Sequence, residues 1–194
     1  MADYFRKVRC LVARFNRKLG SIDGDIFAAH EAGHAIVAAS YPSCRGISHA
    51  KLTGKLGFAG EVRVNMGAGF DGWQDLVFSL AGAAGEYLQT GKVVWENCSS
   101  DLDLALRQIY RGAVAPTNSQ QAAYQLTPDL KIQIERCGLK KPEQIVFGQA
   151  LLEAIVRINS QRAIWEKLRD LLIEKQELNQ AELLPIYRQV RSYS

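Results

Sequence analysis

The sequence predicts a mainly α protein with a small β element. Apolar residues recur at helical spacing over several long stretches. Glycines at positions 46, 54, 57 and 60 divide the segment 45–66 into short runs that are typical of strands and turns. The 194 residues, 47% hydrophobic and 23% charged, have an ordinary globular composition, without internal repeats or a Pro/Ser-rich linker. We therefore expect a single domain over residues 21–194, preceded by a separate helix over residues 1–20.

The first expected element, residues 1–20, is a basic amphipathic helix. This segment holds six basic residues and one acidic residue, a net charge of +5, so the other 174 residues sum to −1. Such a helix either packs on its own domain with a solvated cationic face, or binds a membrane surface or an acidic partner. We expect it to serve in docking or targeting. Since the remaining basic residues are scattered among acidic ones, we expect no nucleic-acid binding. Its apolar positions are Phe5, Val8, Leu11 or Val12, Phe15 and Leu19.

The following elements are read from changes in periodicity. A helix is expected over 25–40, because capping residues precede it and Tyr41-Pro42 follows it. The segment 61–66 alternates polar and apolar residues, as a half-buried strand does. Helical periodicity returns over 73–88, 102–114 and 143–177. The intervening residues 67–72 match G-x-G-x-x-G, but no second strand ending in an acidic residue follows at the required distance, so we interpret them as a flexible loop.

The cysteines and the apolar runs indicate the compartment. The four cysteines are far apart and form no C-x-x-C pair, and a chain of this length needs no disulfide, so we expect free thiols in a reducing environment. No apolar run approaches the roughly 18 to 20 residues that cross a bilayer, and the apolar run at 11–13 is too short for a signal peptide. We therefore expect a cytoplasmic protein. The cysteines are Cys10, Cys44, Cys98 and Cys137.

One motif inside the expected helix 25–40 carries chemistry. Residues 30–34 read H-E-A-G-H and match H-E-x-x-H. Residues four apart lie one turn above each other in a helix, so His30 and His34 can point their imidazoles at one zinc ion. Glu31 lies beside that pair and can accept a proton from a zinc-activated water as general base. The alternative is two hydrogen-bonded core histidines; the small apolar residues around the motif favour zinc, because buried histidines need a partner.

A catalytic zinc ion needs a third protein ligand. Asp101 is favoured, because the segment 98–102 offers capping hydroxyls before an apolar run and would hold this carboxylate in the first turn of a helix. Spacing alone does not choose Asp101 over Glu86. The remaining candidates are His49, Glu61, Asp71, Asp75, Asp103, Cys44 and Cys98.

Three segments carry a resemblance to a known family. Residues 27–38, FAAHEAGHAIVA, look like the zinc-binding helix of the FtsH family of ATP-dependent zinc metalloproteases. Residues 80–86, LAGAAGE, are similar to the family's L-G-G-R-A-A-E helix, and 99–102, SSDL, to its S-N-D-L segment. The segment 168–184 resembles its closing helix. The resemblance covers about 25–187 and implies a helical zincin-like peptidase domain with His30, His34 and Asp101 as ligands and Glu31 as base.

The departures from the family pattern leave these groups in place. Ala83, Gly85 and Ser100 replace an arginine, an alanine and an asparagine, and about one residue is inserted between Gly91 and Asp101. No G-x-x-x-x-G-K-[ST] motif occurs, so an ATPase would have to act in trans on folded substrates. The resemblance also implies a homo-oligomeric ring. We expect a zinc metalloendopeptidase acting on protein or peptide substrates; the alternative is a catalytically silent FtsH-like zinc-binding or regulatory module.

Overall fold

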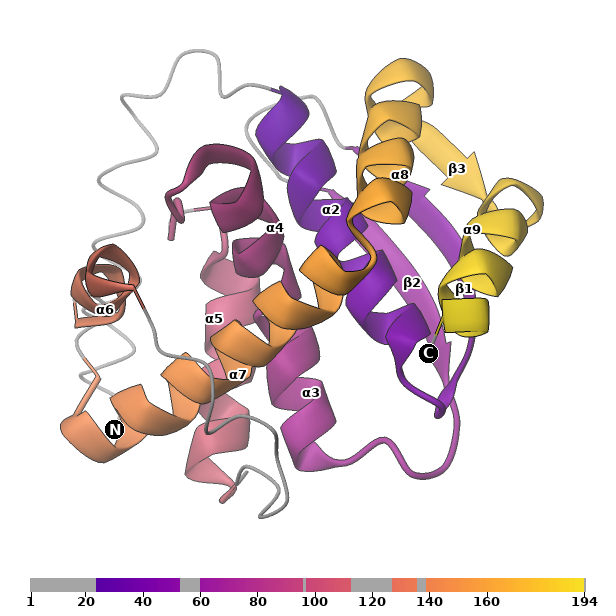
Figure 1. Ribbon diagram of the computed structural model, residues 1–194. Coiled ribbons are helices and arrows are strands. Elements are labelled where there is room, and N and C mark those ends of the chain that lie inside the picture. The colour runs from indigo at the N-terminus through magenta and orange to yellow at the C-terminus, as the bar shows by residue number, and fades with distance from the viewer. Residues whose placement is uncertain (1–23, 53–59, 96, 113–126, 136–138, 194) are drawn as a thin grey trace.

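The computed structural model describes residues 24–52, 60–95, 97–112, 127–135 and 139–193. These residues confirm the mainly α class with a small β element (Figure 1). The predicted helix over 1–20 lies outside the described residues. The elements in chain order are α2 (Gly24–Ser40), β1 (Cys44–Lys51), β2 (Glu61–Met66), α3 (Gly72–Ser79), α4 (Ala81–Thr90), α5 (Ser99–Tyr110), α6 (Pro128–Glu135), α7 (Lys141–Ser160), α8 (Arg162–Lys175), β3 (Glu177–Asn179) and α9 (Gln180–Tyr193).

Helix α2 forms the centre of the molecule. Every residue from Phe27 to Ser40 is buried, as expected of a helix that is apolar on all sides. Figure 1 shows α4 on one side of α2, and α8, the sheet and α9 on the other, with the end of α7 meeting α2 near its middle. Helix α2 contacts all four of these helices and strands β1 and β2. The indole N–H of Trp165 on α8 donates to the backbone carbonyl of Ala29 at 3.2 Å. The two histidines of the motif are therefore held in the most enclosed helix of the described fold.

The β element is an antiparallel sheet with the order β2-β1-β3. Strand β2 coincides with the predicted strand 61–66 and alternates exposed and half-buried positions as its sequence predicts. Strand β1 lies almost entirely within the segment 45–66, where short strand-like runs were expected. Strand β3 was not predicted: residues 177–179 fell within the segment expected as one closing helix. The structure instead ends α8 at Lys175, followed by the C-cap Gln176 with a left-handed φ of 63°, and places β3 against β1 before α9 begins.

Two other predicted helices are divided. The segment 73–88 forms α3 and α4, which meet at Leu80, and 143–177 contains α7 and α8, which meet at Gln161. Neither break coincides with glycine or proline, which explains why apolar periodicity ran through both. Helix α6 was not predicted. The carboxylate of Asp71 caps α3 by accepting from the backbone N–H of Gln74 at 2.8 Å.

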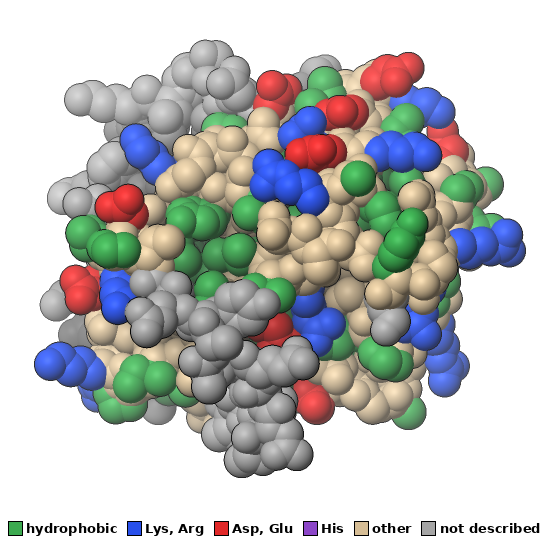
Figure 2. Space-filling view, viewed as in Figure 1, with side chains coloured by type: hydrophobic (Ala, Val, Ile, Leu, Met, Phe, Trp, Pro, Cys, Tyr) green, Lys and Arg blue, Asp and Glu red, His purple; other side chains and the backbone are tan. Residues whose placement is uncertain are grey.

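The core lies between α2, α4, α7 and α8, where Phe147 and Trp165 are fully buried. On the face drawn in Figure 2, basic and acidic side chains are interspersed, and no histidine side chain is seen among its described residues. None of the described helices is both long and apolar enough to pass through a bilayer.

Candidate metal centre

The structure brings together His30, His34 and Asp101, the three predicted zinc ligands. His30 and His34 come from successive turns of α2, and Asp101 comes from the first turn of α5. The two Nε2 atoms are 3.2 Å apart. Oδ2 of Asp101 lies 2.9 Å from His30 Nε2 and 3.2 Å from His34 Nε2. Three potential ligand atoms thus face one small volume.

These separations suit one metal ion. Two ligand atoms of a tetrahedral zinc site, with bonds of about 2.0 to 2.1 Å, are roughly 3.3 Å apart. The observed separations of 2.9 to 3.2 Å fall slightly below that value. Both imidazoles are nearly enclosed, with His30 2% and His34 6% exposed. The Asp101 side chain is 18% exposed, so the group has an opening to solvent on the α5 side.

The other ring nitrogen of each histidine faces a hydrogen-bond acceptor. Nδ1 of His30 lies 2.9 Å from Oε1 of Glu86, and Nδ1 of His34 lies 3.0 Å from the backbone carbonyl of Phe78. An acceptor requires a proton on Nδ1, which leaves the Nε2 lone pair of a neutral imidazole directed away from it. Metal-binding histidines are oriented by such partners. Two lone pairs and a carboxylate oxygen then converge, and a metal cation placed between them can satisfy all three.

The charges of the group follow from this convergence. Burial would raise the pKa of Asp101, but the neighbouring His34 and the hydrogen bonds to both imidazoles hold it below its usual range. Burial would lower the pKa of His30, but its hydrogen bonds to Asp101, Cys98 and Glu86 outweigh burial and raise it well above the usual value. A positive charge at this point is therefore electrostatically favoured.

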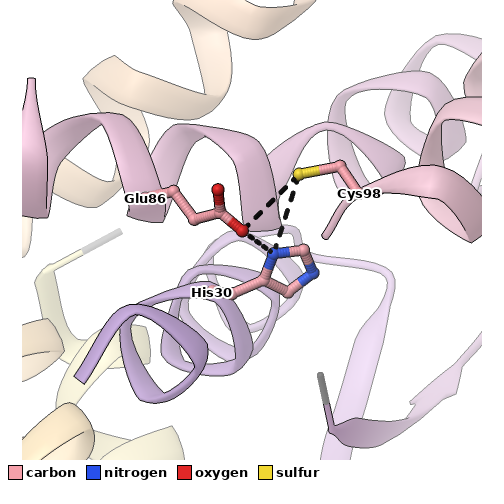
Figure 3. Close-up of side chains that lie close together, drawn as sticks. All are labelled: His30, Glu86 and Cys98. Atoms are coloured by element: carbon pink, nitrogen blue, oxygen red, sulfur yellow. Dashed lines mark hydrogen bonds and ion pairs between the residues drawn. The ribbon is translucent and has the colours of Figure 1, made fainter. Parts of the chain in front are cut away.

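Glu86 and Cys98 lie on the opposite side of the His30 ring (Figure 3). Glu86 is fully buried; its Oε1 faces His30 Nδ1, and its Oε2 accepts from the backbone N–H of Val94 at 2.9 Å. Sγ of Cys98 lies 3.6 Å from the same Oε1. Of the two carboxylates left open by the sequence, Asp101 faces both His30 and His34, whereas Glu86 faces His30 from the Nδ1 side.

The remaining candidates for the third ligand lie elsewhere. His49 and Glu177 face each other across the sheet, Glu61 pairs with Arg63, and Asp71 caps α3. Among the described residues, three further candidates belong to neither of the two clusters that could hold a metal: Asp75, Asp103 and Cys44. Asp75 instead accepts a hydrogen bond from Gln108, and the Cys44 thiol donates to the Gly46 carbonyl.

Asp101 reaches the histidines because α5 begins two residues before it. The predicted position in the first helical turn is confirmed. The predicted capping by hydroxyls is wrong: the N-cap is Cys98, which makes no side-chain capping hydrogen bond. The Asp101 carboxylate is oriented by the two imidazoles instead.

Glycines create the space that the His30 ring occupies. A Cβ atom on Gly82 of α4 would overlap three ring atoms of His30. A Cβ on Gly33 would overlap the carbonyl oxygen of Ala81, and one on Gly85 that of Ala29. Helices α2 and α4 therefore approach backbone to backbone at the level of the motif. The spacing of these glycines is the sequence signal that indicates this close helix packing.

Glu31, the predicted general base, lies beside the cluster on α2. It is 3% exposed, and burial raises the pKa of its carboxyl group, against the opposing effect of the two imidazoles. A Cβ on Gly60, the residue before β2, would lie 2.7 Å from Glu31 Cγ and 2.8 Å from its Oε1. The glutamate therefore occupies the narrow space between α2 and the start of β2.

Comparison with known proteins assigns no family to this arrangement. No model of a known protein family matches the sequence, and no curated protein matches it. The likeness to FtsH proteases therefore remains a resemblance in the motifs around His30, Glu86 and Asp101.

Proposed function

We propose that the protein is a zinc-dependent metalloendopeptidase of FtsH-like type. The observation that carries this proposal is the convergence of His30 Nε2, His34 Nε2 and Asp101 Oδ2, with both Nδ1 atoms facing acceptors. Two imidazoles and one carboxylate are a donor set that catalytic zinc sites use, with a further position for water or substrate. The residues present therefore fit a zinc ion.

The residues divide the chemistry between them. When bound, zinc would polarise a substrate carbonyl and make a water molecule acidic. Glu31 would accept the proton of the attacking water and pass it to the leaving amine nitrogen. Its burial favours this role, because a carboxylate that is poorly solvated holds a proton more readily than an exposed one. The contacts with Glu86 and with the Phe78 carbonyl would orient the rings of His30 and His34 so that each Nε2 faces the ion.

Strand β2 is the element that we propose to hold the substrate. Within the described residues β2 pairs with β1 on one side and has no strand on the other. Gly60, next to its first residue, touches the space occupied by Glu31. An extended peptide added along this edge would be fixed by main-chain hydrogen bonds near the base. Substrates of this kind are unfolded segments or peptides.

We also propose the compartment, the partner and the assembly in which this activity takes place. Cys44 and Cys98 are buried free thiols, which supports a reducing compartment such as the cytoplasm. Folded substrates would need an ATPase in trans, and the ring assembly implied by the resemblance would bring several sites together.

Hydrolysis of casein and of fluorogenic peptides tests the proposal, with zinc content measured on the same samples. Glu31→Gln should keep its zinc and lose about 10²- to 10⁴-fold in rate, because the base is lost but the ligands remain. Glu174→Gln, at an exposed glutamate near the end of α8, serves as the matched control and should retain the rate. Bound zinc without hydrolysis in either wild type or variant, across many substrates, would instead favour the silent zinc-binding module.

A further inference from the structure

A second group of potential metal ligands lies on the far side of His30. Nδ1 of His30, Oε1 of Glu86 and Sγ of Cys98 come from α2, α4 and the residue that precedes α5 (Figure 3). The three atoms are separated by 2.9 Å (Nδ1 to Oε1), 3.6 Å (Sγ to Oε1) and 3.9 Å (Sγ to Nδ1). The cysteine is 1% exposed and the other two residues are equally enclosed.

This triangle has the dimensions of a metal site. A point about 2.0 Å from all three atoms lies close to their plane, and protein bonds to zinc are about 2.0 to 2.2 Å for nitrogen and oxygen and about 2.3 Å for sulfur. The fit is therefore within a few tenths of an ångström. A planar arrangement of three donors that includes a thiolate suits soft ions such as Cu⁺ or Cd²⁺ better than hard ions.

The shared histidine makes the two groups exclusive. A neutral imidazole has one lone pair, so His30 can offer either Nε2 to the His34 and Asp101 side or Nδ1 to the Glu86 and Cys98 side. When Nδ1 binds an ion it carries no proton, and the N–H that remains on Nε2 donates a hydrogen bond to Oδ2 of Asp101, 2.9 Å away. The Cys98 thiol proton is released to solvent. Whichever ring nitrogen of His30 binds an ion, the other faces a carboxylate that can accept its proton in a hydrogen bond: Glu86 at Nδ1 or Asp101 at Nε2.

We propose that His30, Glu86 and Cys98 form a second, thiolate-containing metal site that binds soft metal ions and competes with the His30–His34–Asp101 site for the His30 lone pair. Binding at one site weakens binding at the other by the same factor, because the coupling of two binding free energies is reciprocal. Where the proposed peptidase activity exists, on which this consequence depends, a soft ion at Cys98 would draw His30 away from the catalytic zinc.

Cadmium titration of the metal-free full-length chain tests the site. Thiolate-to-cadmium charge-transfer absorption reports sulfur ligation alone. A variant that keeps Cys98 and carries serine at the other three cysteine positions should show one equivalent of cadmium–thiolate absorption. Cys98→Ser should abolish it in that background, and Glu86→Gln should raise the cadmium concentration for half-saturation by more than the roughly 10- to 100-fold that loss of an outer partner causes.

Two comparisons separate this proposal from the peptidase proposal. His34→Ala breaks only the other site, so the cadmium–thiolate absorption should persist. The same absorption in a wild-type protein that retains no zinc would support the soft-metal site and refute the catalytic one. In zinc-loaded wild type, cadmium should release zinc at a concentration at least about tenfold lower than in Cys98→Ser. Cys44→Ser, at another buried free thiol, should behave as wild type.

Three results would overturn the second site. The first is no thiolate absorption in a Cys98-only protein with a native circular dichroism spectrum. The second is absorption that survives Cys98→Ser in that background. The third is equal zinc release by wild type and Cys98→Ser. If the multiple-serine variant does not fold, the difference spectrum between wild type and Cys98→Ser, with Cys44→Ser as control, decides the same question.

Discussion

Gly82→Ala tests whether the room left for His30 sets its affinity for metal. The added Cβ would overlap the ring, and the ring atoms would have to retreat by about 1 Å to reach ordinary contact at 3.4 Å or more. Ligand positions at a metal site tolerate deviations of about 0.2 Å. His30 should therefore be lost as an effective ligand. Since the loss of an outer partner alone costs about 10- to 100-fold, we expect zinc to bind more than about 100-fold more weakly, or about 2.7 kcal/mol.

The same substitution should change folding stability much less. Replacing glycine by alanine inside a helix gains up to about 1 kcal/mol in helix propensity. Overpacking costs about 1 to 3 kcal/mol. The two effects partly cancel, so the net loss is about 0 to 2 kcal/mol, which for a chain of this size lowers the melting temperature by no more than roughly 8 °C. Zinc affinity is therefore the sensitive quantity, and stability is the check that the fold survives.

Competition with a chromophoric chelator measures the zinc dissociation constant, and thermal circular dichroism measures the fold. Gly24→Ala is the matched control, because a Cβ at this helical glycine meets nothing within 4 Å. It should leave zinc affinity unchanged and stability equal or slightly higher. A Gly82→Ala protein that is folded and binds zinc within about twofold of wild type would refute the reasoning that His30 is confined by α4.

Three other substitutions, the last with a control variant, separate effects on metal binding, proton transfer and stability. Asp101→Asn removes the only charged ligand and should weaken zinc binding at least about tenfold by calorimetry; unchanged affinity would point to another ligand. Gly60→Ala crowds Glu31 and should lower kcat roughly 10²-fold with zinc retained, whereas an unaltered kcat would contradict the assigned position of the base. Phe147→Ala, at a fully buried ring, should lower the free energy of unfolding by about 3 to 5 kcal/mol in urea denaturation. Its control Ile145→Ala, at a side chain that is 62% exposed, should change it by less than about 0.5 kcal/mol. Equal effects of the two substitutions would contradict the described core.

The part of the site that lies on one helix could be predicted from the sequence. His30 and His34 follow from helical spacing, because residues four apart share a face, and Glu31 follows from the H-E-x-x-H motif. Asp101 could be placed in a helical turn but not chosen over Glu86. That choice depends on which side of the His30 ring each carboxylate approaches, a property of how α4 and α5 pack and not of either segment.

Elements that depend on tertiary contacts could not be predicted. Residues 177–179 are extended because they pair with β1, although the sequence around them reads as helix. The division between α3 and α4 at Leu80 has no glycine or proline signal. After this division α4 packs against α2, so that Gly82 lies against His30. The surroundings of His30, His34 and Asp101 are thus set by helix packing, which local periodicity does not encode.

X-ray absorption at the zinc edge of the purified, zinc-loaded protein tests the central claim most directly. We expect two imidazole nitrogens and one carboxylate oxygen at about 2.0 to 2.2 Å from zinc. A fourth oxygen donor would complete the site, and no sulfur would be bound. His34→Ala should remove one imidazole from this pattern. A zinc–sulfur distance of about 2.3 Å in the singly loaded protein, or no retained zinc at all, would contradict the assignment of His30, His34 and Asp101.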